Sequence, residues 1–120
     1  MKRIYIAGPY SADNVLDVLQ NIGRGEALAA DVFARGMAPF TPWHDKDFCI
    51  KLHDQKFTVQ QFYDYSMAWL EVSDAVLLVP GWERSTGTMD EIDRAKELGI
   101  PIFESIESLS RWAAKTITGH

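Results

Sequence analysis

The chain has 120 residues, of which 47% are hydrophobic and 24% charged, and its formal net charge is −5. These values are typical of one globular domain, which we predict to span residues 1–120. The acidic balance argues against a broad basic surface for a DNA or RNA polymer, but it is compatible with a small anionic ligand held by local groups.

The cysteine content and the N-terminal segment indicate the cellular compartment in which we expect the protein. Cys49 is the only cysteine, so one chain can form neither an intrachain disulfide nor a thiolate zinc site. The apolar run near Met1 is about five residues long, which is too short for a signal-peptide core or a membrane span. We therefore expect a cytoplasmic protein that does not bind a membrane.

The first predicted elements are a strand and a long helix. Residues 4–7 are apolar and predict a buried strand, and Asp13 or Asn14 can cap a helix that continues to about residue 35. Gly23 and Gly25 weaken the middle of this helix by about 1 kcal/mol each relative to alanine. We expect a kink or a close contact at these glycines.

The central part of the chain contains a short strand, an irregular segment and a helix. Residues 37–40 predict a strand near an edge of the sheet, because their proline cannot donate to a ladder. Residues 41–56 are predicted to be irregular, and a connection this long is usually functional or mobile. Thr58 and Gln61 form a capping box that opens a helix to about residue 72.

The last elements complete an alternation of strands and helices. Residues 74–79 form a continuous apolar run typical of a central parallel strand, and a helix, a strand over residues 100–103 and a last helix over residues 105–118 follow. This order predicts an α/β fold with a flavodoxin-like or Rossmann-like, doubly wound parallel sheet of four to five strands in the order 2-1-3-4. Ligands bind such sheets outside the carboxyl ends of the strands, here where the loops after strands one and three meet.

The polar run STGTMDE, residues 85–91, follows the third strand and opens a helix. Helix N-termini present unpaired N–H groups that suit phosphate, and a carboxylate held there can attack a sugar carbon. We expect Glu91 in the first turn, where the helix dipole holds its pKa low. Thr88 and Glu91 also fit a capping box, so a purely structural role for Glu91 stays open.

Two segments resemble signatures of the nucleoside 2-deoxyribosyltransferase family. They are IYIAGPYS at residues 4–11, and DAVLLVPGW at residues 74–82 with STGTMDEI at residues 85–92. The resemblance, which includes the 5′-monophosphate N-glycosidase branch, implies cleavage or exchange of the N-glycosidic bond of a (deoxy)nucleoside or nucleoside 5′-monophosphate. It implies a covalent glutamyl-sugar intermediate on Glu91, a 5′-phosphate contact at Ser85, and no organic cofactor.

Further substrate contacts are expected in the two loops that meet at the crevice. The resemblance places sugar or phosphate contacts in the loop after the first strand, and the polar turn offers hydroxyls and backbone donors. The candidate residues are Gly8, Tyr10, Ser11, Ser85, Gly87 and Thr88. Tyr5, within the first strand, is expected in the core rather than in the site.

The base of the substrate needs a stacking surface and polar contacts. Trp82 and Trp43 lie in loops and are candidates to stack on a base. His44 or Asp45 could contact the base from the irregular segment. The same segment contains residue types that can bind a metal ion, but their spacing matches no recognised metal site, so we expect no metal. These residues are His44, Asp45, Asp47, His53 and Asp54.

One position departs from the family pattern. The family usually has an aspartate eight positions before the leading aspartate of the third strand, and counting back from Asp74 gives Ser66. Asp64 is our candidate to assist catalysis instead, although it lies about 200° around the helix from Ser66. The departure favours an alternative, a nucleotide-binding sensor without turnover, and a small interaction module is a third possibility.

Aromatic side chains on two helices predict association with further copies of the chain. Phe62, Tyr65 and Trp69 lie on the helix after residue 58, and Trp112 lies on the last helix. This is more apolar surface than four strands readily cover, so we expect a homo-oligomer.

Overall fold

The computed structural model describes residues 1–10, 12–52 and 54–118, without the side chains of residues 44, 46, 49 and 116–118. Its sheet has four parallel strands in the order β2-β1-β3-β4. The strands are β1 (Arg3–Ala7), β2 (Ala38–Phe40), β3 (Ala75–Leu78) and β4 (Ile102–Phe103). The predicted α/β class, the order 2-1-3-4 and the edge position of the proline-containing strand are confirmed.

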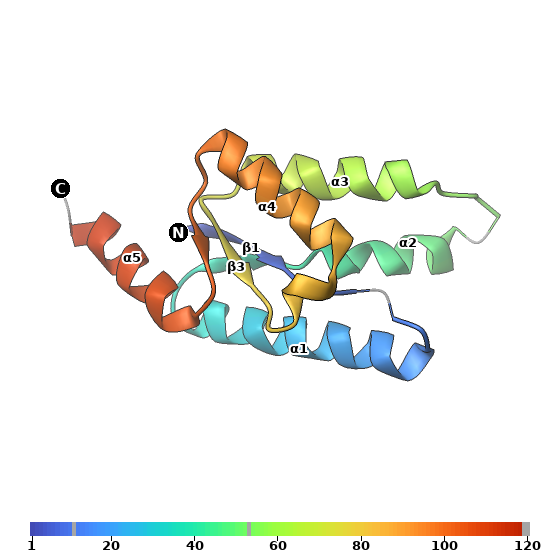
Figure 1. Cartoon of the computed structure of the whole chain (residues 1–120), viewed down its shortest axis with the longest axis horizontal. Helices are drawn as coiled ribbons and strands as arrows, with labels where there is room; N and C mark the ends of the chain where they lie inside the picture. Colours follow the sequence, from blue (N-terminus) through green and yellow to red (C-terminus); the bar gives the residue numbers. More distant parts are fainter. Residues whose placement is uncertain (11, 53, 119–120) are drawn as a thin grey trace.

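Helices cover both faces of the sheet (Figure 1). They are α1 (Val15–Ala34), α3 (Val59–Glu71), α4 (Thr86–Leu98) and α5 (Ile106–Thr118), together with the short α2 (Lys46–Lys51). One core cluster joins Ile4 and Ile6 to α1 and α5, and a second joins Tyr5 and Ala7 to α3 and α4. Because side chains alternate along a strand, Tyr5 faces α3 and α4.

Local capping explains where the long helices begin and end. The Asn14 side chain accepts from the backbone N–H of Asp17 at the start of α1, as predicted. Thr58 and Gln61 form the predicted capping box of α3. Gly99 ends α4 with a φ of 71°, a left-handed conformation that glycine adopts at little cost.

The prediction of an irregular segment over residues 41–56 is wrong for much of its length. The chain there forms a 3-10 turn, η1 (Pro42–Asp45), and then α2. A helix of six residues is too short to show a period in the sequence, and its N-cap, Asp45, makes no side-chain cap bond. The edge-on contact of the Phe48 and Tyr65 rings places α2 beside α3.

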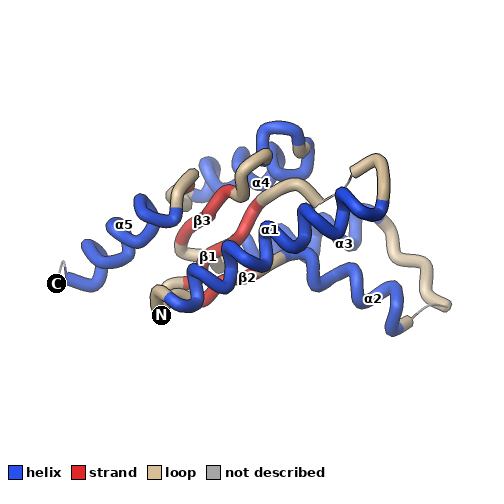
Figure 2. The backbone as a smooth tube through the Cα atoms, turned by 90° about the horizontal axis from the view of Figure 1, so that it is seen from below, coloured by secondary structure: helices blue, strands red, loops and turns tan. Residues whose placement is uncertain are grey.

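The two ends of the chain lie on the same side of the molecule, opposite α2 (Figure 2). The carboxyl ends of the strands therefore face the side of α2, and the amino ends face the side of the termini. Within the described part of the chain, no helix is long and apolar enough to cross a membrane.

Candidate functional site

The centre of the site is a pair of buried side chains, Tyr5 on β1 and Glu91 on α4. The Tyr5 hydroxyl donates a hydrogen bond to Oε2 of Glu91. Tyr5 is 0% exposed and Glu91 is 9% exposed. Glu91 thus lies against the first strand, on the face of the sheet that α3 and α4 cover.

The position of Glu91 within α4 differs from the sequence prediction. The helix begins at Thr86, and Ser85 is its N-cap, with Oγ 3.2 Å from the backbone nitrogen of Thr88. Glu91 therefore lies in the second turn rather than the first. The predicted capping box of Thr88 and Glu91 is wrong, because Ser85 provides the cap and Glu91 turns to Tyr5.

Burial sets the acidity of Glu91. It raises the pKa of this carboxyl from 4.5 to about 7; the hydrogen bond from Tyr5 opposes the rise, and the charge of Asp90 adds to it. The prediction of a low pKa is wrong, because removal from water outweighs the helix dipole one turn away. The pKa of the Tyr5 phenol is raised well above its ordinary value by burial and by Glu91. Tyr5 thus remains a donor, and Glu91 titrates near neutral pH.

Polar groups from α3 and η1 surround the Tyr5 hydroxyl. The Ser66 side chain lies close enough to the Tyr5 hydroxyl to lower the pKa of Tyr5, and the charge of Asp45 raises the pKa of both Tyr5 and Tyr65. The exposed carboxylate of Asp64 instead accepts from Nε2 of Gln60 at 2.7 Å. The structure brings Ser66 and Asp45 toward the pair, and it turns the predicted catalytic Asp64 away.

The polar turn places three candidate residues at the start of α4. Gly87 is exposed, and the only atom near a Cβ built on it is Oγ of Ser85 at 4.0 Å, so its backbone is open to close approach. The Thr88 hydroxyl is buried and, among the residues that the structure describes, has no hydrogen-bond partner. A Cβ on Gly8 would lie 2.5 Å from Cβ of Val79, so glycine there is required by packing between the ends of β1 and β3.

The two tryptophans lie on opposite faces of the sheet. Trp82 is half-buried and packs on the α3–α4 side, the side of Glu91. Trp43 is 2% exposed in the core under α1, where its ring abuts Gly25. The close contact predicted near Gly25 is confirmed, but this burial leaves Trp43 no free ring face for a base.

Tyr10 is 36% exposed in the loop after β1. Ser11, His53 and the side chain of His44 lie outside the described part of the structure.

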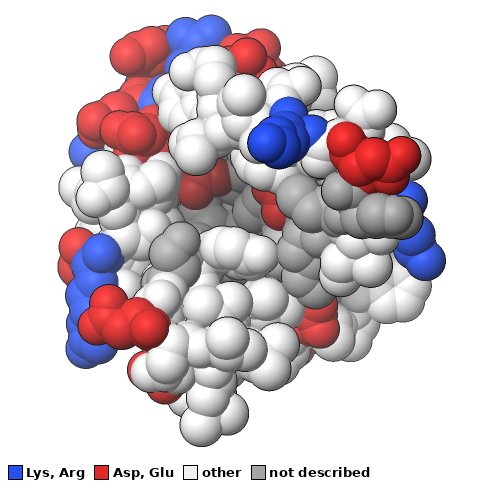
Figure 3. All heavy atoms as spheres, turned by 90° about the vertical axis from the view of Figure 1, so that its right-hand side faces the viewer, with Lys and Arg blue, Asp and Glu red and all other residues white. Residues whose placement is uncertain are grey.

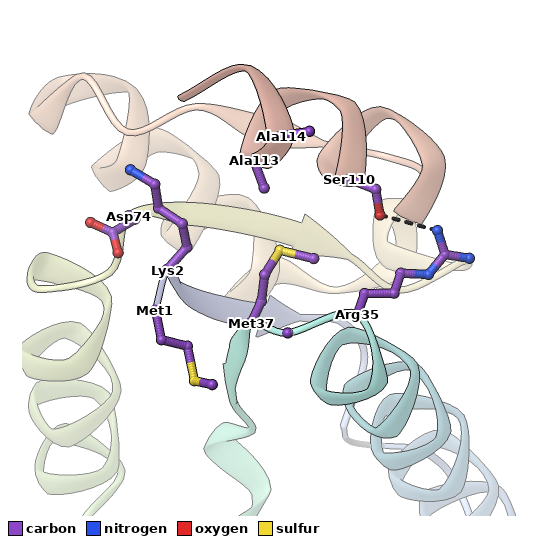
Figure 4. A pocket seen from close by; sticks show the side chains of 9 residues that line it. Met1, Lys2, Arg35, Met37, Asp74, Ser110, Ala113 and Ala114 are labelled. Atoms are coloured by element: carbon purple, nitrogen blue, oxygen red, sulfur yellow. Dashed lines mark hydrogen bonds between the residues drawn. The ribbon is translucent and has the colours of Figure 1, made fainter. Parts of the chain in front are cut away.

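Two concave regions lie at opposite ends of the strands. The face at the carboxyl ends is hollowed, with acidic atoms visible inside the hollow and mostly uncharged side chains around it (Figure 3). A cavity of about 640 Å³ opens at the amino ends, between α1 and α5 (Figure 4). It is lined by Lys2, Arg35 and Asp74 among others, and by none of the predicted site residues.

Among the residues described, no group of three or more histidine, cysteine or acidic side chains could hold a metal ion.

The sheet order and the helix layers define a doubly wound α/β fold, which is the fold of two solved 2-deoxyribosyltransferases. Two solved structures are similar, each with a TM-score of 0.59. The 2-deoxyribosyltransferase from Bacillus psychrosaccharolyticus is 19% identical, over 83% of this chain and 69% of that one. The 2-desoxiribosyltransferase from Leishmania mexicana is 20% identical, over 85% of this chain and 62% of that one, so this chain spans less than two thirds of its length. The likeness shows the fold.

Residues 2–105 match the family described as "Domain of unknown function (DUF7768)". The chain belongs to this family. A comparison with curated proteins gives no match.

Proposed function

We propose that this protein cleaves or exchanges the N-glycosidic bond of a (deoxy)nucleoside or nucleoside 5′-monophosphate, with Glu91 as the nucleophile. The observation that carries the proposal is the buried carboxylate of Glu91, held by Tyr5 of β1, the strand that pairs with β3. The structural neighbours named as 2-deoxyribosyltransferases support the same class of reaction.

The chemistry follows from the two carboxylate oxygens of Glu91. The oxygen that Tyr5 does not hold attacks C1′, and the C1′–N bond breaks as the base leaves with its electron pair and takes up a proton. Developing positive charge on the sugar is stabilised by the adjacent carboxylate. Water or a second base then attacks C1′ of the glutamyl-sugar ester, and Glu91 leaves as a carboxylate.

Groups around the pair take the remaining roles. At the start of α4, the backbone of Gly87 and the Ser85 hydroxyl, whose proton is free to donate, are suited to a 5′-phosphate. Trp82 is our candidate for stacking on the base, since it lies on the face of Glu91. Asp45, rather than Asp64, is our candidate to assist the departing base, since its charge acts at Tyr5.

Base release by the Glu91→Gln variant is the first test. The purified protein is incubated with deoxynucleosides, ribonucleosides and their 5′-monophosphates, and free base is measured by chromatography. The wild type should release base from at least one class, and E91Q should lose this activity by at least about 10³-fold, because the attacking oxygen is gone.

The exposed Asp93 on the same helix provides the matched control. Asp93→Asn removes one carboxylate from α4 and should leave base release unchanged. Undiminished activity of E91Q, or equal losses in E91Q and D93N, would refute the nucleophilic role.

A nucleotide-binding sensor without turnover is the second candidate function. It is favoured by Ser66, which stands where the resembling family has an aspartate and whose side chain lies near the Tyr5 hydroxyl. Tight binding of a nucleotide in calorimetry, with no base released from any substrate of the panel, would select the sensor over the enzyme.

A further inference from the structure

Within the described residues, the Thr88 hydroxyl on the inner face of α4 is a buried polar group that has no hydrogen-bond partner. Thr88 is 1% exposed, and its hydroxyl oxygen is both buried and unpaired. Glu91 accepts one hydrogen bond, from Tyr5 to Oε2, and within the described residues its other oxygen accepts none. Leaving a buried hydroxyl unpaired costs stability, so its retention at this position calls for an explanation.

Helix geometry makes the side chains of Thr88 and Glu91 neighbours on one face of α4. Thr88 and Glu91 are three positions apart, so their Cβ atoms are about 5–6 Å from each other. Side chains in a helix lean toward its N-terminus, and the Glu91 carboxyl therefore extends over the turn that contains Thr88. A helical threonine has two accessible χ1 rotamers, which point its hydroxyl in different directions.

We propose that Thr88 is a positioning residue for Glu91, whose hydroxyl rotates to donate to the second carboxylate oxygen when Glu91 is ionised and is released when Glu91 is protonated. The carboxylate then has two donors, Tyr5 and Thr88. Its oxygens carry about four lone-pair sites in all, so one on the second oxygen remains available for attack. The catalytic purpose of this contact rests on the proposed function, but the contact itself does not.

The groups that face Glu91 explain why a second donor is needed. Tyr5 from β1 donates to it, while Asp90 on α4 adds a like charge. Beyond Tyr5 lie Ser66 from α3 and the negative charge of Asp45 from η1. Burial and neighbouring negative charge both disfavour the carboxylate, so a further hydrogen bond to the charged form increases the ionised fraction.

Measurement of the Glu91 pKa, by carbon NMR of the labelled side chain without substrate, tests the proposal. Thr88→Val keeps the shape and removes the hydroxyl, and it should raise the pKa of Glu91 by about one unit, a tenfold loss of carboxylate at a given pH. Thr88→Ser retains the hydroxyl and should leave the pKa close to the wild-type value. An unchanged pKa in T88V, or equal shifts in T88V and T88S, would overturn the proposal.

The melting temperature of T88V relative to the wild type, measured at several pH values, is a second test, because a change in packing alone would not depend on pH. At about pH 5, where Glu91 is protonated and the hydroxyl unpaired, T88V should melt above the wild type. At about pH 9, T88V should melt at a lower temperature than the wild type. The pKa of Glu91 in the folded protein is higher in T88V, so the stability of T88V falls further than that of the wild type as the pH rises. In the Glu91→Gln background the effect of T88V should not vary with pH. A constant difference between T88V and wild type across this range would refute the contact, whether or not the enzyme reading stands.

Discussion

Tyr5 is a core residue that also contacts Glu91, the proposed nucleophile. The sequence predicts the first role, from an apolar strand, and the structure adds the second, because the hydroxyl bonds Glu91. The hydroxyl of a buried tyrosine usually has a hydrogen-bond partner. The position of Tyr5, two residues from the end of a central strand, therefore indicates a polar partner near the carboxyl ends of the strands, where ligands bind such sheets. Its partner could not be predicted, because it lies 86 positions away in the chain.

Replacing Tyr5 with phenylalanine removes the donor that favours the charged form of Glu91. We expect Tyr5→Phe to raise the pKa of Glu91 by about one unit and to lower base release at neutral pH, with partial recovery as the pH rises. The pH profile of kcat/KM checks this. Tyr63→Phe, on the exposed side of α3, is the control and should leave the profile unchanged. A profile in Y5F identical to the wild type would contradict a role for Tyr5 in tuning Glu91.

At the scale of elements, the sequence predicts the features that neighbouring residues decide, such as the ends of helices. Asn14, the Thr58–Gln61 box and Gly99 mark helix ends in the sequence and in the structure alike. The helical character of the segment after β2 was missed, because tertiary contacts rather than caps or periodicity hold it. The pKa of Glu91 was mispredicted for a similar reason, since burial is a property of the packed molecule.

The two central glycines of α1 provide a matched pair for testing element packing. A Cβ on Gly25 would lie 2.2 Å from the Trp43 ring, whereas a Cβ on Gly23 would meet nothing within 4 Å. Gly25→Ala should destabilise the fold by about 1–3 kcal/mol through overpacking. Gly23→Ala should stabilise it by up to about 1 kcal/mol through helix propensity. Urea unfolding measures both, and equal effects of the two substitutions would contradict the close packing of α1 on Trp43.

At the scale of the whole molecule, the sheet order brings residues from both ends of the sequence to one crevice. β1 and β3 pair directly, with Tyr5 opposite Val76, and α4 lays Glu91 over β1. The homo-oligomer remains a prediction, to be checked by light scattering. Of the two tryptophans behind this prediction, Trp69 is 46% exposed and Trp112 is half-buried against the core cluster of α1 and α5.

The buried carboxylate also makes the stability of the whole molecule depend on pH. Glu91 has a pKa of about 7 in the folded protein, against an ordinary value of 4.5. Between these values the folded state binds more protons than the unfolded state, so stability falls as the pH rises from about 4.5 to about 7 and then levels off. The distance between the two pKa values corresponds to about 3 kcal/mol.

Glu91→Gln removes this titration and keeps an oxygen to accept the Tyr5 hydrogen bond. We expect E91Q to be more stable than the wild type above about pH 7, by up to about 3 kcal/mol, and to lose that advantage below about pH 5. Urea unfolding across this range measures the difference, and Asp93→Asn should retain the wild-type slope. A wild-type stability that falls no more steeply than that of E91Q would mean that water reaches the carboxylate. If the predicted slope is found, the proposed nucleophile is also a residue that the fold holds at a cost in stability, as is common where a site requires a buried charge.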